Sequence, residues 1–170
     1  MNLAKAFLPE AVEVLGKYYK IHTGHSFWFR FSQLLNEDKL FLHDVDFLYD
    51  GEIPEDRQAG FDALCKFFYE KKEIPRCEGG ENILDYDIDA ELLYAGILQC
   101  YGIDLFDEQY HWHKVRAMIV GLHGTKLNEV FGIRSWSDTK NKEAMKLKRE
   151  WALPEKENKE AIDFFDKFGA

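Results

Sequence analysis

Apolar and polar residues alternate in a short stretch near the N-terminus, and this alternation predicts a β-hairpin over about residues 10–22. Val12 and Val14 would face one side of the first strand, and Tyr19 and Ile21 would face one way on the return strand. Gly16 stands between the strands, where it can supply the positive φ angle that a tight turn requires. Because an isolated two-stranded ribbon is marginal in water, we expect the hairpin to pack on other elements.

After Gly24 the apolar residues recur at the three- and four-residue spacing of amphipathic helices. Ser26 stands at the start of the first such pattern and is a candidate N-cap. The second pattern follows residues 53–56, where a proline and two acids predict a helix start. Its apolar stripe would be formed by Phe61, Leu64, Cys65 and Phe68.

The middle of the chain, residues 85–103, is apolar nearly all round, which predicts a central, buried helix. Asp85 or Asp87 would cap its N-terminus, and Gly102 would end it. Four further helices are predicted over residues 108–120, 127–133, 138–151 and 156–168.

These elements predict a mainly α fold. A compact helical domain over residues 1–154 would carry the hairpin, and a C-terminal amphipathic helix over residues 155–170 would be appended to it after Pro154. The length of 170 residues fits one such domain, and 46% hydrophobic residues suffice for a core, which excludes disorder over the whole chain.

Composition also bears on the compartment. The three cysteines stand at wide spacings, which is typical of reduced thiols and not of a disulfide framework. The N-terminal residues lack the pattern of a signal peptide, and no stretch reaches about 18 consecutive apolar residues. We therefore expect a cytoplasmic protein.

The charge balance disfavours a role in coating nucleic acids. The chain has 31 acidic and 22 basic residues, a net charge of −9 that repels phosphate backbones. One segment differs, because residues 140–151 hold five basic residues against two acids. This stretch is either a solvated helix face or a contact for nucleic acid or an acidic partner.

Two motifs suggest metal binding but fail on inspection. His111 and His113 would diverge on a helix, where His113 would point to solvent. The three acids of the DYDID run match the first positions of a calcium loop. Ala90 then stands where glycine is required, and Gly96 stands where a bidentate glutamate belongs. We expect no metal site and no cofactor.

Candidate nucleophiles are equally weak. Cys65 lies on an apolar stripe and Cys100 ends the apolar run, so both are typical of small core residues. No G-x-S-x-G motif is present, and the GLHGTK segment has neither the glycine spacing nor the preceding strand of a phosphate loop. The sequence therefore predicts a protein that is not an enzyme.

Several segments together resemble a known family. They are the hairpin around Gly16, the FDALCKFFYE run, the LDYDIDAELLYAGILQCYGIDLFD run, HWHKVRAMIVGL and FGIRSW. These segments, which span about residues 8–154, resemble the phage "gene product fifteen" family of tail-module proteins from long-tailed phages and prophages of Gram-positive hosts. One departure is His113, where the family pattern has a second tryptophan.

This resemblance implies a tail assembly chaperone, because the genes of the family lie close to that of the tape-measure protein. Such a protein would bind and solubilise the tape-measure protein in the host cytoplasm during tail tube assembly, could also meet the tail tube protein, and would be absent from the mature virion. The competing hypotheses are a nucleic-acid-associated accessory factor that uses the basic helix around 140–149, and a small metal-dependent enzyme built from scattered His and Asp residues.

The partner-binding residues predicted for this role are Trp112, Arg116, Arg134 and Trp136, because Trp and Arg are enriched in interface hot spots. Trp112 has a competing interpretation as a core residue, which its helical position favours. Phe164, Phe165 and Phe168 form a further stripe in the C-terminal segment. That stripe would pack on the protein's own core or in a groove of another chain, which makes self-association an open alternative.

Overall fold

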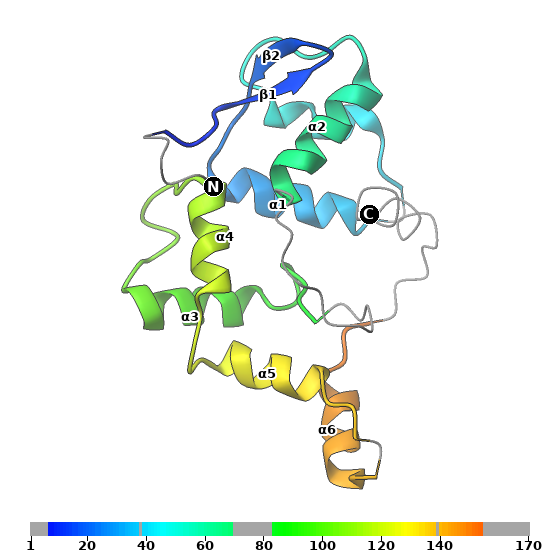
Figure 1. The fold of residues 1–170 in the computed structure, drawn as a ribbon, viewed down its shortest axis with the longest axis vertical. Coiled ribbons are helices and arrows are strands. Elements are labelled where there is room, and N and C mark those ends of the chain that lie inside the picture. The colour runs from blue at the N-terminus through cyan, green and yellow to red at the C-terminus, as the bar shows by residue number, and fades with distance from the viewer. Residues whose placement is uncertain (1–6, 38, 70–82, 139, 155–170) are drawn as a thin grey trace.

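The computed structural model describes residues 7–37, 39–69, 83–138 and 140–154 (Figure 1). A two-stranded hairpin comes first, and seven helical segments follow it in the described residues, so the fold is mainly α as predicted. In chain order the elements are β1 (Ala11–Val14), β2 (Lys17–Lys20), α1 (His25–Leu35), the 3₁₀ helix η1 (Leu42–Leu48), α2 (Arg57–Tyr69), α3 (Ala90–Tyr101), α4 (Trp112–Val120), α5 (Lys126–Arg134) and α6 (Lys142–Trp151).

The hairpin forms as predicted. Val12 pairs with Tyr19 and Val14 with Lys17 in an antiparallel register. The turn has φ values of 49° at Leu15 and 83° at Gly16, the two positive angles of the turn type that suits a two-residue hairpin loop. The inward side chains of β1 are buried, and α2 packs against this strand.

An aromatic core joins the hairpin, α1, η1 and α2 to the start of α4. Trp28 and Trp112 are fully buried in it, and the ring of Phe68 stacks on Trp112 with 4.9 Å between the ring centroids. Both indole N–H groups are satisfied: Trp28 donates to the carbonyl of His22, and Trp112 donates to that of Phe68 over 3.0 Å. The large rings therefore enter the core without an unpaired donor.

A second, aliphatic cluster joins α3, α4 and α5. Its centre is formed by Leu93, Ile97, Val115 and Leu127, all essentially inaccessible to solvent. Gly96 makes the close packing possible, because a Cβ atom there would lie 3.2 Å from the side chain of Leu122. The hairpin and α6 lie at opposite ends of the longest axis of the molecule (Figure 1).

Two predictions about helix starts need correction. Gly24, and not Ser26, is the N-cap of α1. The Ser26 hydroxyl instead donates to the side-chain oxygen of Gln109, in the loop before α4. The N-cap of α3 is Asp89, later than predicted. Asp85 caps the preceding turn, where its carboxylate accepts the N–H groups of Asp87 and Ile88.

The burial of α3 and of His113 also differs from the predictions. Only Leu93, Gly96 and Ile97 of α3 are buried, so α3 is a surface helix and not a central one. His113 is buried, because its Nε2 donates to the carbonyl of Phe67 and its ring stacks on Phe67. Gly102 ends α3 in the left-handed conformation, as predicted.

Candidate partner-binding surface

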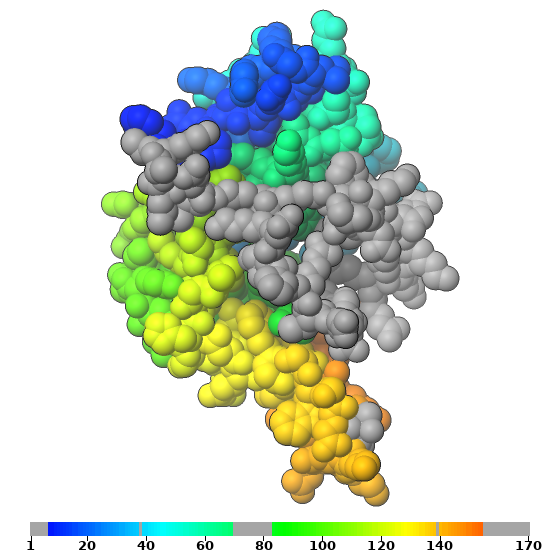
Figure 2. Space-filling model, in the orientation of Figure 1, coloured from blue at the N-terminus to red at the C-terminus, as the bar shows by residue number. Residues whose placement is uncertain are grey.

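The corner formed by α5 and α6 exposes the large apolar side chains of Trp136 and Leu147 to solvent. None of the residues of α6 is buried. The helix packs on α5 and protrudes from the end of the body (Figures 1 and 2). A helix in this position leaves apolar surface accessible to a partner.

An apolar groove of about 270 Å³ runs between the two helices. It is lined by Glu129, Gly132, Ile133, Trp136, Ala144 and Leu147. Trp136 is 43% exposed and Leu147 is 40% exposed, so both side chains are available to a partner. Since Glu129 supplies the only charge among the lining residues, this groove fits an apolar side chain or the apolar face of a helix.

Arg134 holds this corner to the body. Its guanidinium forms a bidentate salt bridge with Asp89, at 2.7 and 2.9 Å, in which both side chains are almost completely buried. The same guanidinium donates to the carbonyl of Trp151 at the end of α6 and to that of Ile83. One side chain thus ties together the start of α3, the end of α5 and the end of α6.

Caps and local contacts fix the two helices that border the groove. Thr125 and Asn128 form a reciprocal capping box at the start of α5, and Asn141 caps α6 by accepting the N–H of Ala144. Lys148 donates to the carbonyl of Trp136, which holds the loop between the helices. Such caps stabilise short helices whose ends are exposed.

The predicted partner-binding residues fall into different environments. Trp136 lines the groove. Trp112 and Arg134 are both buried: Trp112 lies in the aromatic core, and the guanidinium of Arg134 donates to Asp89 and to the carbonyl of Trp151 inside the protein. Arg116 is half-buried near Tyr69 and Tyr86, and burial lowers the pKa of its guanidinium. The three C-terminal residues Phe164, Phe165 and Phe168 lie outside the described residues.

The groove also contains Ile133, Ala144 and Leu147, which were not among the predicted partner-binding residues. A signal for them was present: Ala144 and Leu147 are three residues apart on a helix whose other positions are mostly charged. Within residues 140–151 the basic residues outnumber the apolar residues, so the apolar side of the helix is easily overlooked in the sequence.

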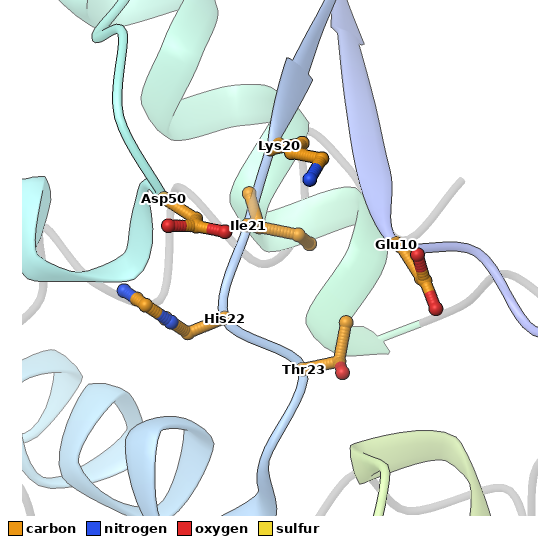
Figure 3. Close-up of a pocket in the computed structure, with 6 residues that line it drawn as sticks. All are labelled: Glu10, Lys20, Ile21, His22, Thr23 and Asp50. Carbon is orange, nitrogen blue, oxygen red and sulfur yellow. The ribbon is translucent and has the colours of Figure 1, made fainter.

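A second hollow lies beside the hairpin, and it is polar. It is lined by Glu10, Lys20, Ile21, His22, Thr23 and Asp50 (Figure 3). The side chains of His22 and Glu10 point to opposite sides of the connecting strand and do not converge on a common point (Figure 3). Backbone hydrogen bonds from Ile21 to Glu10 and from Asp50 to Lys20 account for the close approach of these segments. The hollow therefore gives no basis for a chemical site.

Burial shifts the pKa of two titratable side chains in the core, Cys65 and His113, toward the uncharged form. Burial raises the pKa of the Cys65 thiol, which keeps it protonated and unreactive. Burial lowers the pKa of His113 to about 4, so its imidazole is neutral at pH 7.

In the parts of the chain that the structure describes, no group of three His, Cys, Asp or Glu side chains could hold a metal ion. The described helices also include none that is long and apolar enough to cross a membrane.

Comparison with known protein families identifies the chain. The sequence profile of the family described as "Bacteriophage Gp15 protein" matches residues 5–153, which is most of the chain. No curated protein and no solved structure matches. The chain therefore belongs to the bacteriophage Gp15 protein family and is a phage-related protein.

Proposed function

We propose that this phage protein is a non-enzymatic tail assembly chaperone that binds and solubilises the tape-measure protein while the tail tube forms. The observation that carries the proposal is the exposed apolar groove between α5 and α6, on a protein of the bacteriophage Gp15 family. The role would be played in the host cytoplasm, and the chaperone would leave before the virion is complete.

The groove has the properties that recognition of a helix requires. Trp136 and Leu147 offer a large aromatic and an aliphatic contact, which an amphipathic helix can cover with residues one turn apart. Arg134 keeps the two walls of the groove in a fixed relation, so binding does not have to order them first. A long helical tape-measure protein would present such apolar helix faces repeatedly.

The charge of the protein supports the same role. At a net charge of −9 the chaperone would lend repulsion, and hence solubility, to an aggregation-prone partner. Binding of this kind needs exposed apolar surface and charge but no nucleophile or metal. The buried, protonated thiol of Cys65 and the neutral His113 agree with a protein that performs no covalent chemistry.

The proposal is tested by co-expression with the tape-measure protein, the long downstream gene product of the same operon. The soluble fraction of the tape-measure protein is measured with wild-type chaperone, with the Trp136→Ala/Leu147→Gln variant and without chaperone. We expect the wild type to keep the partner soluble and to co-elute with it, and the groove variant to lose most of this effect. Aggregation of the partner in all three cultures would refute the proposal.

A second candidate function is association with nucleic acid, and one observation favours it. Lys142, Lys146 and Arg149 are all exposed on α6 and lie along one face of this helix. A titration of duplex DNA at increasing salt tests this function, because real phosphate contacts give a steep loss of affinity with salt. Binding that survives the reversal of these three charges would not come from α6.

A further inference from the structure

The two sides of α6 differ in chemistry. Ala144 and Leu147 line the groove next to α5. The opposite side carries Lys142, Lys146 and Arg149, which follow the i, i+4, i+7 spacing of a single helix face and are all exposed. The helical period places these three residues, here called the basic face, on the side opposite to Ala144 and Leu147. The helix itself protrudes from the body (Figure 2).

The loop between α3 and α4 carries the opposite charge. Asp107 and Glu108 are exposed there, and Asp104 lies two residues before Phe106. Phe106 is 87% exposed, which is unusual for a large aromatic side chain. Residues 104–108 are called the acidic loop below.

Local contacts hold Phe106 at the surface. Its backbone N–H donates to Asp104 over 2.9 Å, and the hydroxyl of Tyr94 donates to the other oxygen of the same carboxylate. The ring of Phe106 lies against that of Tyr94, with 5.2 Å between the centroids. The exposed ring is therefore fixed in place among carboxylates, an arrangement that suits a cationic partner surface.

We propose that the basic face of α6 binds the acidic loop of a second copy of this chain. The ammonium and guanidinium groups would meet the carboxylates of Asp107 and Glu108. The aliphatic stems of the basic side chains would cover the Phe106 ring, with cation–π attraction added. The two surfaces belong to different regions of the chain, so each copy can bind one neighbour with its basic face and another with its acidic loop.

Such a head-to-tail contact generates rows or rings of copies, and it leaves the apolar groove on the other side of α6 free. Because the contact consists largely of exposed ion pairs, each worth little, it is weak and sensitive to salt. A row of copies with open grooves would bind a long partner with avidity. This last consequence rests on the proposed function, whereas the contact between copies does not.

The test is the mass of the full chain by sedimentation velocity and light scattering over a concentration series, at about 50 mM and about 500 mM salt. We expect reversible association that weakens at least about tenfold at the higher salt. The Lys142→Glu/Lys146→Glu/Arg149→Glu variant and the Asp107→Lys/Glu108→Lys variant should each be monomeric. A mixture of the two should associate again, because each then offers the charge that the other requires.

Matched controls separate the contact from general charge and from exposed rings. Lys20→Glu/Lys39→Glu/Lys66→Glu changes the net charge by the same amount at exposed sites elsewhere and should leave the association constant unchanged. Phe7 is also 87% exposed, so Phe7→Ala is the control for Phe106→Ala, which should weaken association several-fold. Far-ultraviolet circular dichroism of each variant confirms that it is folded.

Four results would overturn the proposal. The first is a monomer at every concentration at low salt, and the second is association that the charge reversals leave intact. The third is association that is lost when residues 155–170 are deleted, combined with a failure of the two charge-reversal variants to associate when they are mixed. The fourth is salt-dependent binding of duplex DNA that requires the basic face, without self-association. If the monomeric variants no longer associate but still capture the tape-measure protein, the proposed function stands.

Discussion

Two tryptophans mark two regions of the molecule that use apolar side chains in different ways. Trp112 is fully enclosed by aromatic rings, and its indole N–H is bonded to the carbonyl of Phe68. Trp136 is 43% exposed at the α5–α6 corner, where its ring forms a wall of an open groove. The first region is stabilised by burial of large rings, whereas α6 in the second region has no buried residue and is held by its cap, by α5 and by Arg134.

The residues that stabilise the aromatic core and the residues proposed to bind a partner therefore lie in different segments of the chain. The residues that build the aromatic core cannot contact a partner, because they are inaccessible in the folded protein. Helix α6 has no buried residue, so its apolar side chains are accessible to a partner. The following experiments test this separation, beginning with the largest expected effect.

The core tryptophan should dominate stability. We expect Trp112→Ala to lower the free energy of unfolding by about 3–5 kcal/mol, because it removes a buried ring and leaves a cavity. Trp136→Ala should lower it by less than about 1 kcal/mol, as for other exposed sites. Urea denaturation measures the free energy of unfolding of both variants. Equal losses of this free energy would contradict the division of roles between the two tryptophans.

Arg134 should be the link between the two regions. Arg134→Lys keeps the positive charge but loses the planar, bidentate contact with Asp89, and we expect a loss of about 2–3 kcal/mol. Hydrogen exchange should show the amides of α6 opening more often, because the bond to the carbonyl of Trp151 is lost. Arg149→Lys is the matched control on an exposed arginine, and unchanged exchange in α6 of the Arg134 variant would refute the link.

The buried His113 predicts a loss of stability in acid. Because burial lowers its pKa in the folded state to about 4, the unfolded chain binds the proton more readily below pH 6.5. Stability from this group is complete above pH 6.5 and is lost as the pH falls toward 4. We expect a loss of about 1–2 kcal/mol between pH 6.5 and pH 5.

The control for that measurement is His113→Gln, whose side chain does not titrate. Burial also lowers the pKa of His25 and His111, so the variant should retain part of the acid sensitivity. Denaturation at several pH values compares the two slopes. A wild-type slope no steeper than that of the variant would show that the pKa of His113 is not lowered in the folded protein.

The smallest effect concerns the cap of α5. The Thr125 hydroxyl accepts the N–H of Asn128 and is buried, so Thr125→Ala should cost about 1 kcal/mol. Ser137→Ala, at an exposed position, should change the free energy of unfolding by less than about 0.5 kcal/mol. Thermal denaturation followed by circular dichroism resolves this difference, and equal melting temperatures would argue against a role for the cap.

Much of the fold could be predicted from local patterns. The alternation around Gly16 specified the hairpin, and the stripe of Phe61, Leu64, Cys65 and Phe68 specified the buried side of α2. Patterns of this kind depend only on neighbouring residues and on the period of the element. The end of α3 at Gly102 was equally predictable, because glycine adopts the left-handed conformation without strain.

Contacts between distant segments could not be predicted. His113 can be buried because α2 supplies the carbonyl of Phe67 as its partner. Arg134 can be buried because it pairs with Asp89, which lies 45 residues away in sequence. Nothing in the local pattern around either residue indicates these partners. The apolar run of α3 was misleading for the same reason, since the fold covers only one side of this helix.

The measurement that tests the central claim most directly is site-specific photo-crosslinking in cells that produce this protein and the tape-measure protein. The photoreactive side chain replaces Leu147 in the groove or, as the matched control, Leu98 on α3, which is 41% exposed and so almost as accessible as Leu147. We expect an adduct with the tape-measure protein from position 147 and none from position 98. Adducts from position 98 alone, or from neither position while the two proteins still co-purify, would show that the α5–α6 groove is not the binding surface.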